Sequence, residues 1–316
     1  MQLALTAYRI APTAEARSSL LTMSALAPVT RLRPASGTAT ALAVGRGGTF
    51  VAAGTTDGGV ALWRSAEVNP LAPAGIIKTS DAAVTLLGLA GNGSLLVVQS
   101  RQAQLRMWDV ADPVHPRDLG NLSGMRGTPQ SVAVSADGHA IVAGTEQGEI
   151  YVWNVREPTK PAVTSPLSGR PVTSVAWAGD GRTLATGGDQ GTVTLWHVAD
   201  GGPLVQAGAP PGATSRIFSL AFSADGRRLA AGTGAQHDVF IWDVADQAHP
   251  RAVGAPLTGP ASWVNSVSFS PDGTTVAAAS SDSELWLFDV ASGRAIEQLP
   301  HPNPVIGAAF VPPGRS

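Results

Sequence analysis

Residues 217–244 read IFSLAFSADGRRLAAGTGAQHDVFIWDV, and this stretch holds one copy of the pattern that decides the fold. It begins with alternating apolar residues, continues with a run of small aliphatic residues and ends in a third run that closes on Trp242. Alternation with a period of two is typical of β-strands, and the pair Asp225-Gly226 permits the positive φ of a tight turn. The stretch therefore predicts three strands, the first two joined by a two-residue hairpin.

The pattern recurs along the whole chain. Turn glycines follow one another at steps of 45, 45, 43, 45 and 47 residues, at Gly48, Gly93, Gly138, Gly181, Gly226 and Gly273. Large aromatic residues keep a matching interval, with steps of 45, 45, 43, 46 and 46, at Trp63, Trp108, Trp153, Trp196, Trp242 and Phe288. Two residue classes with different chemistry rarely share a period by chance, so we interpret the aromatic series as structural residues that fill the space between repeats.

Each repeat also contains a weaker fourth run after a proline-rich connection, such as Pro250–Gly254, and proline beside a short strand suits a sheet edge. Four strands in about 45 residues are typical of one blade of a β-propeller. Phe222–Gly226 and Trp242–Val244 resemble WD40 repeats, as do Phe269–Gly273 and Trp108–Val110. The resemblance implies an all-β fold, a WD40-like β-propeller of six complete blades plus an incomplete seventh over residues 28–316.

The closing blade departs from the family pattern. Val305–Phe310 resembles an innermost strand, and Val29–Arg33 resembles an outermost strand that leads into an inner strand at Thr40–Val44. We find no sequence for the two middle strands of a seventh blade. Three arrangements stay open: a six-bladed ring with leftover strands, a seven-blade geometry with a notch, or a truncated product. We favour the notch, whose exposed strand edge invites pairing with a strand-donating chain.

The hydrogen-bond network of the family is also incomplete. WD40 blades typically link a loop histidine, a strand Ser or Thr, a turn aspartate and the Trp. The expected histidine positions hold Met125, Ala213 and Pro260, and the turn aspartate is kept as Asp57 and Asp282. We therefore expect the blades to depend on Trp packing and sheet hydrogen bonds.

Residues 1–27 do not follow the repeat, and their apolar spacing together with the Pro12-Thr13 break predicts a short helical hairpin. Leu3–Leu21 resembles the linker that precedes the propeller in bacterial signal-transduction ATPases of the STAND/NACHT type. The sequence of Pro116–Gly124 also resembles these proteins. The resemblance implies a sensor domain whose partners include an ATPase module. No phosphate-binding G-x-x-x-x-G-K-[ST] motif occurs in the sequence.

Composition narrows the class of protein further. The net charge of −2 and the pI near 6.3 provide no basic field for a phosphate backbone, so we expect no nucleic-acid partner. The sequence contains no cysteine, which excludes disulfides and thiolate metal sites. No apolar run approaches the roughly 20 residues of a membrane span, and the first residues lack a signal-peptide pattern. We expect a cytoplasmic protein without a membrane partner.

No motif in the sequence predicts chemistry. The six histidines are scattered without metal-ligand spacing, and Gly45–Gly48 lies where a hairpin turn is expected. We predict no catalytic residues, no cofactor and no metal, and hence no enzyme. The alternative is a propeller hydrolase with a site in the central funnel. It needs carboxylates or histidines on the inner strands, where the sequence offers Ala, Val, Ser and Thr.

The WD40 resemblance implies that protein partners bind the loops before the inner strands and between the second and third strands. On the first set of loops we select Arg126, Arg170, Arg216, Trp263 and Asn265, because Arg and Trp are enriched at interface hot spots. Facing loops carry Arg101, Glu146, Asp189 and Gln236. The alternative for each residue is a solvated loop position, or a packing role in the case of Trp263. The predicted function is a non-catalytic scaffold or sensor that binds proteins.

Overall fold

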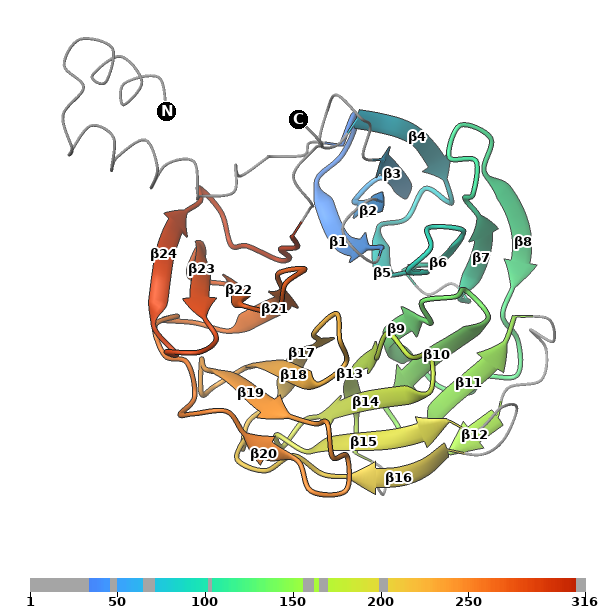
Figure 1. The fold of residues 1–316 in the computed structure, drawn as a ribbon. Helices are drawn as coiled ribbons and strands as arrows, with labels where there is room; N and C mark the ends of the chain where they lie inside the picture. Colours follow the sequence, from blue (N-terminus) through green and yellow to red (C-terminus); the bar gives the residue numbers. More distant parts are fainter. Residues whose placement is uncertain are drawn as a thin grey trace, which may run out of the picture. The chain divides into compact units, whose positions relative to one another are not determined.

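The computed structural model describes residues 34–45, 50–64, 72–101, 104–155, 162–164, 170–198 and 204–310. The chain divides into two compact units, Met1–Arg33 and Pro34–Ser316, and all described residues belong to the second. The helical hairpin expected over residues 1–27 and the strand expected at Val29–Arg33 lie outside the described residues. Within the second unit the described strands form six four-stranded antiparallel sheets, which we call blades 1 to 6 (Figure 1).

Each blade takes four consecutive strands. Blades 1 to 3 contain β1 (Ala39–Val44), β2 (Phe50–Thr55), β3 (Gly59–Arg64), β4 (Ala72–Lys78), β5 (Val84–Leu89), β6 (Leu95–Ser100), β7 (Arg106–Asp109), β8 (Arg117–Asn121), β9 (Pro129–Val134), β10 (Ala140–Thr145), β11 (Ile150–Asn154) and β12 (Ala162–Thr164). Blades 4 to 6 contain β13 (Val172–Trp177), β14 (Thr183–Gly188), β15 (Val193–Val198), β16 (Leu204–Gly208), β17 (Ile217–Phe222), β18 (Arg228–Thr233), β19 (Val239–Asp243), β20 (Arg251–Ala252), β21 (Val264–Phe269), β22 (Thr275–Ser280), β23 (Glu284–Asp289) and β24 (Ala295–Pro300).

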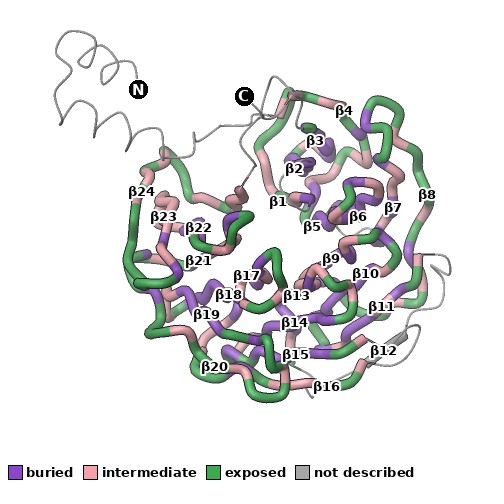
Figure 2. Tube along the Cα trace, viewed as in Figure 1, coloured by how far each residue is buried: buried purple, intermediate pink, exposed green. Residues whose placement is uncertain are grey.

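The first strand of each blade is the innermost. These strands lie side by side in chain order, β1 on β5, then β9, β13, β17 and β21, around a common centre (Figure 1). The second strands are almost entirely buried, whereas the outermost strands are largely exposed (Figure 2). This is the architecture of a six-bladed β-propeller, which confirms the six predicted complete blades; the incomplete seventh blade stays a prediction.

The described turns after the innermost strands of blades 2 to 6 are longer than the sequence suggests. Five turn glycines have φ between 66° and 77°, at Gly93, Gly138, Gly181, Gly226 and Gly273, while Gly48 lies outside the described residues. The predicted two-residue hairpin is wrong, however, because five residues separate β17 from β18. The N–H of Gly226 donates to the carbonyl of Ser223 at 2.9 Å, and the N–H of Ser223 donates to the carbonyl of Arg228 at 2.9 Å. Glycine thus closes a four-residue turn inside a wider loop.

The serine side chain explains the wider loop. The hydroxyl of Ser223 donates to Asp225 at 2.5 Å and accepts the N–H of Arg228 at 3.0 Å, so it takes the place of one ladder bond. The same Ser-x-Asp arrangement recurs at Ser135 and Ser270. The hydrogen bond from Ser223 holds the pKa of Asp225 below its usual range, and that from Ser270 does the same for the pKa of Asp272.

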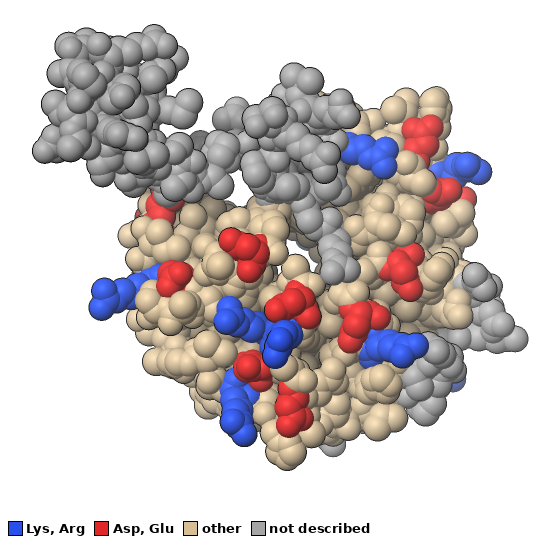
Figure 3. All heavy atoms as spheres, in the orientation of Figure 1, with Lys and Arg blue, Asp and Glu red and all other residues tan. Residues whose placement is uncertain are grey.

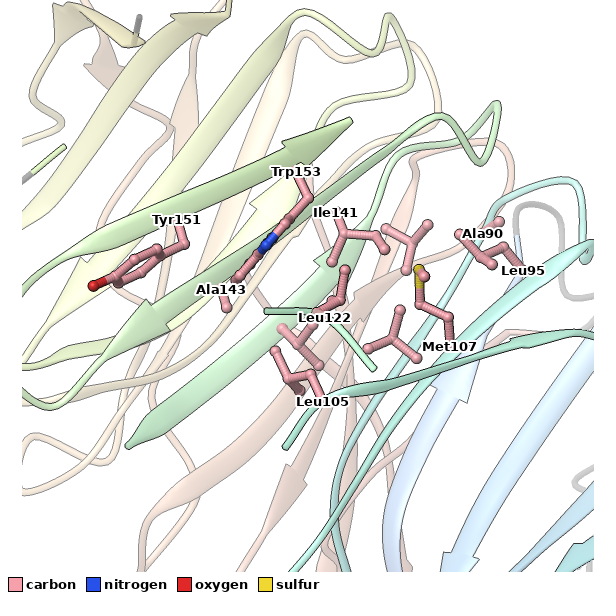
Figure 4. Close-up of a cluster of buried hydrophobic side chains, with 12 residues drawn as sticks. Ala90, Leu95, Leu105, Met107, Leu122, Ile141, Ala143, Tyr151 and Trp153 are labelled. Atoms are coloured by element: carbon pink, nitrogen blue, oxygen red, sulfur yellow. The ribbon is translucent and has the colours of Figure 1, made fainter. Parts of the chain in front are cut away.

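The periodic aromatic residues fill the spaces between blades. All six lie in the third strands as predicted, and Trp153, Trp242 and Phe288 are completely buried. Figure 4 shows Trp153 beside Ile141 and Ala143, within the group that joins blades 2 and 3.

Two indoles also find backbone partners that the sequence did not reveal. The N–H of Trp153 donates to the carbonyl of Ser123 at 2.9 Å, and that of Trp242 donates to the carbonyl of Pro211 at 2.8 Å. These carbonyls lie in the loops that lack the family histidine. Met125 and Ala213, which hold the expected histidine positions, pack against the apolar clusters that contain these two indoles. Blades 3 and 5 therefore combine Trp packing with an indole-to-backbone hydrogen bond, whereas the indole of Trp196 in blade 4 donates to the hydroxyl of Thr186 at 2.9 Å.

Glycines in the second strands set the distance between blades. A methyl group added at Gly187 would lie 2.6 Å from Cγ2 of Ile217, the first residue of the next inner strand. A methyl group added at any of three other second-strand glycines would likewise lie too close to a valine side chain of the following blade: Gly54, Gly144 and Gly232. Since real carbon atoms do not approach this closely, the blades can pack at this distance only where the second strand carries no side chain.

We expect Gly187→Ala to destabilise the protein by about 1–3 kcal/mol, because the added methyl group overpacks the contact with Ile217. Urea unfolding measures the change. The matched control is Ala279→Gly, at the same strand position in blade 6, where a methyl group is already accommodated. That control should cost only the backbone entropy of about 0.5–1 kcal/mol. A Gly187→Ala protein as stable as the wild type would contradict the close-approach argument.

We also expect the serine turns to make stability depend on pH in the acidic range. The folded-state pKa values of Asp225 and Asp272 lie below the unfolded value of about 3.9, so the stabilisation is present above that pH and is lost as pH falls through the folded pKa. The double variant Ser223→Ala/Ser270→Ala should therefore lose less stability than the wild type between about pH 5 and pH 2. Thermal melting across this range tests the difference; parallel curves for the two proteins would refute it.

Candidate functional site

Two sets of loops meet at the same end of every blade. The inner and second strands are antiparallel, so the first residue of one lies opposite the last residue of the other, as Ile217 lies opposite Thr233 and Val264 opposite Ser280. The loop that enters an inner strand therefore lies beside the loop that leaves the second strand. We call the loops that enter β9, β13, β17 and β21, with those that leave β10, β14, β18 and β22, the loop face.

A stacked series of side chains crosses three blades of the loop face. Arg216 forms an ion pair with Asp189 of blade 4, 3.3 Å between Nη1 and Oδ1. Its guanidinium lies over the ring of Phe218, 5.3 Å from the centroid. The ring of Phe218 stacks in turn on Trp263 of blade 6, with centroids 5.4 Å apart and planes 22° apart. Asp189, Arg216, Phe218 and Trp263 form the aromatic ladder, which the structure assembles from residues far apart in the sequence.

The ladder leaves one large apolar surface open to solvent. Trp263 is 52% exposed, whereas Phe218 is partly buried. Gly234 makes room for this arrangement, because a methyl group there would lie 2.9 Å from Cε2 of Phe218. The stack below holds the indole in one orientation, so a partner that covers it loses little side-chain entropy on binding.

Two other predicted residues lie on the same face but outside the ladder. Arg170 is exposed, and its guanidinium donates to the side-chain oxygen of Gln190 at the exit from the second strand of its own blade. Arg126 is exposed as well, and its backbone N–H donates to the hydroxyl of Tyr151 at 3.0 Å. That hydroxyl donates to the carboxylate of Glu149 at 2.6 Å, which orders the loop. The structure thus places these two arginines on the loop face, separately from Arg216.

Asn265 and Gln236 have structural contacts. The side-chain amide of Asn265 donates to the hydroxyl of Ser281 at 2.8 Å and to the carbonyl of Val305 at 3.0 Å. The side-chain oxygen of Gln236 accepts the N–H groups of Thr214 and Ser215 at 2.8 and 3.1 Å and ties two loops of blade 5 together.

Phe218 is the functional candidate that sequence reasoning missed. It is the second residue of its inner strand, a position that holds a polar residue in the other five blades: Thr40, Thr85, Gln130, Thr173 and Asn265. Three of these polar side chains bond to the carbonyl of the segment that follows, whereas Phe218 stacks on the next blade instead. The sequence signal for this residue was a phenylalanine at a position where the other repeats have a polar side chain.

The inner strands offer little for acid–base chemistry. The sequences of β1, β5, β9, β13, β17 and β21 contain no Asp, Glu, His, Lys or Arg. Across the described residues, no group of three or more His, Asp or Glu side chains is placed to hold a metal ion. A pocket of about 290 Å³ lies on blade 5 beside Asp238 and Phe240, and burial raises the pKa of Asp238.

Charge is sparse and mixed on the visible surface. Figure 3 shows acidic and basic side chains interspersed among uncharged residues, with no continuous patch of one sign on that face. The part of the chain that the structure describes includes no helix long and apolar enough to cross a membrane.

Comparison with known proteins agrees with the geometry. The WD40 family, described as WD domain, G-beta repeat, matches residues 162–197, 207–243 and 253–289. Each match starts at or next to the outermost strand of one blade and extends to the third strand of the next, as in β12 to β15. The WD repeat-containing protein SL1-17 of Schistosoma mansoni is 41% identical over 80 residues, which make up 25% of this chain and 25% of the relative. The match therefore spans a quarter of that relative's length. The chain carries WD40 repeats within a six-bladed β-propeller.

Proposed function

We propose that this chain is a non-catalytic protein-interaction domain, a scaffold or sensor, that binds a protein partner through its loop face. WD40 propellers generally bind protein partners, which supports the class of function. The observation that carries the choice of surface is Trp263, a half-exposed tryptophan held in place by the stack beneath it. Tryptophan and arginine are the residue types that most often dominate binding energy at interfaces.

The energetics favour the ladder as an anchor. A buried aromatic side chain removes about 150–250 Å² from water, so covering the exposed half of Trp263 contributes about 2–3 kcal/mol. Arg216 and Asp189 already neutralise each other. The partner therefore needs an apolar pocket for the indole with polar groups around it, and it does not need a strong opposite charge. Arg170 and Arg126 provide charged contacts at the rim of the same surface.

We also propose that residues 305–310 hold the inner-strand place of a seventh blade. Thr40 donates to the carbonyl of Val84 in the next blade at 2.6 Å, and Thr173 donates to the carbonyl of Ile217 at 2.6 Å. Asn265, at the same position of blade 6, donates to the carbonyl of Val305 at 3.0 Å. Val305 therefore has the same relation to blade 6 as Val84 has to blade 1 and Ile217 has to blade 4.

The other side of this segment supports the same placement. A methyl group added at Gly307 would lie 3.1 Å from Cδ2 of Leu42, so the segment touches β1 as well as blade 6. The N–H of Val305 also donates to the carbonyl of Ser280 at 3.0 Å. Residues 305–310 form no ladder with a second strand among the described residues, which is why they are not part of a sheet.

We also propose a partner class and a cellular location for this chain. The resemblance of Leu3–Leu21 to the linker of bacterial signal-transduction ATPases supports an ATPase module as one partner class, and with it a cytoplasmic role in signalling. Copurification of the full chain with an ATPase of that class, encoded in the same organism, tests this partner separately from the loop face.

We expect Trp263→Ala and Arg170→Glu to remove partner proteins that the wild type captures, because both change the loop face without touching the core. Affinity capture followed by mass spectrometry compares the protein lists. The matched control is Val114→Ala, which truncates a 66% exposed apolar residue outside the loop face. Thermal melting checks that all variants are folded. Identical lists for the wild type and both loop-face variants would count against this surface.

A further inference from the structure

A carboxylate without a hydrogen-bond donor lines the pocket on blade 5. Asp238 stands directly before β19, where its backbone N–H donates to the hydroxyl of Thr233 at 3.0 Å, and its side chain lines the pocket of about 290 Å³. Burial raises the pKa of Asp238, and only attraction to the neighbouring His237 acts in the opposite direction, so no donor among the described residues bonds this carboxylate. A desolvated carboxylate without a donor disfavours folding, which points to a role other than stability.

Blade 3 shows how the repeat can satisfy a carboxylate at this position. Glu149 stands directly before the third strand of its blade, as Asp238 does, and Tyr151 holds the position of Phe240. The hydroxyl of Tyr151 donates to the carboxylate of Glu149 at 2.6 Å. The two rings are placed alike, since each stacks on the tryptophan of its own blade with centroids 5.7 Å apart. Phe240 has no hydroxyl, and the side chain of Asp238 is one methylene shorter than that of Glu149, so blade 5 lacks this bond.

The loop that enters the inner strand is the same in both blades. The indole of the third-strand tryptophan donates to the carbonyl of Ser123 in blade 3 and to that of Pro211 in blade 5. The glycine that follows has a positive φ in both, 86° at Gly124 and 109° at Gly212. A methyl group added at Gly212 would lie 3.4 Å from Cε1 of Phe240, so this loop borders the ring. The pocket of blade 5 therefore lies where blade 3 places a tyrosine hydroxyl.

We propose that this pocket binds the guanidinium group of an arginine side chain from a protein partner, with the carboxylate of Asp238 as its acceptor. Most of the walls are apolar and suit the aliphatic part of such a side chain: Pro211, Phe240, Ala252, Ala255 and Pro256. A guanidinium group presents parallel N–H donors that match the two oxygens of a carboxylate. It is also less strongly hydrated than an ammonium group, so it loses less on entering an apolar pocket.

The pocket belongs to the loop face, so the inference rests on the proposed function and adds a chemical requirement to the partner. Pro211 lies in the loop that enters β17, and Gln236 and Asp238 lie in the loop that leaves β18. The side-chain oxygen of Gln236 accepts the N–H of Ser215, the residue directly before Arg216 of the aromatic ladder. One pair of loops thus carries both the pocket and part of the ladder, and a partner that covers the loop face can contact both.

The probe is N-acetylarginine methylamide, titrated into the full chain and followed by 15N–1H NMR. We expect the backbone amides of Asp238 and Phe240 to shift saturably. The citrulline analogue, which has nearly the same shape but no charge, should bind at least tenfold more weakly, and Asp238→Asn should weaken binding of the arginine probe by the same factor, about 1.4 kcal/mol. The matched control is Asp243→Asn, which alters an exposed carboxylate at the other end of β19 and changes the net charge equally. Binding to that control should not change.

Thermal melting separates a binding role from a structural one. Asp238→Asn should melt at or above the temperature of the wild type, because it removes a desolvated charge that has no described donor. A clear drop in melting temperature would show a structural role and overturn the proposal. Asp238→Glu/Phe240→Tyr installs the pair of blade 3, so it should raise the melting temperature and abolish probe binding, since the tyrosine hydroxyl then takes the place of the guanidinium group.

The remaining outcomes decide the ligand and its source. Absence of saturable binding, equal binding of the citrulline analogue, or tighter binding of the lysine analogue would each overturn the assignment to a guanidinium group. Affinity capture with Asp238→Asn should lose proteins that the wild type retains. An unchanged capture list together with specific probe binding would overturn the assignment to a protein partner in favour of a free guanidinium compound. The loop face itself is tested by Trp263→Ala, whose capture list does not depend on the probe titration, so either proposal can fail alone.

Discussion

The close approach of successive blades is the constraint on which the rest of this structure depends. A second strand with glycine at one position lets a valine or isoleucine of the next inner strand lie against its backbone, as Gly187 does for Ile217. The third-strand aromatic then fills the wider space further out, where Trp153 and Trp242 are completely buried. Removing either element would leave an overlap or a void, and closely packed interiors tolerate neither well. The repeat of about 45 residues carries this complementarity from blade to blade.

The same junction determines where the surface can differ from the repeat. Polar residues at the second inner-strand position normally bond to the following segment, as Thr173 does to Ile217. Blade 5 has Phe218 at this position, whose side chain cannot donate such a hydrogen bond. The ring of Phe218 stacks on Trp263 instead, and the guanidinium of Arg216 lies over the ring of Phe218. The second residue of the inner strand, which in other blades joins two blades by a hydrogen bond, here supports an exposed aromatic surface. A local change in a structural position is thus sufficient to create a candidate binding site.

Among the described residues, the junction between blades 6 and 1 differs from the other blade junctions. Residues 305–310 keep the hydrogen bonds to blade 6 through Asn265 and Ser280, but they make no ladder with a second strand among the described residues. Ala279 stands in blade 6 where four other blades have glycine, and its side chain is completely buried. Leu42, Leu285 and Leu287 are partly exposed at this junction, whereas Trp63 and Ala277 are buried there.

The sequence by itself determined the period, the strand order within each repeat and the positions of the aromatic residues, because alternation, turn glycines and Trp spacing are local signals with direct conformational meaning. It also pointed to the face on which Arg170, Arg216 and Trp263 lie. It misjudged the turn length, since the Ser223 hydroxyl substitutes for a backbone bond in a way that composition does not reveal. Only the tertiary structure decided that Asn265 holds Val305, that Phe218 links Arg216 to Trp263, and that backbone carbonyls replace the absent loop histidines. These contacts join residues from different blades, and blade packing in three dimensions brings them together.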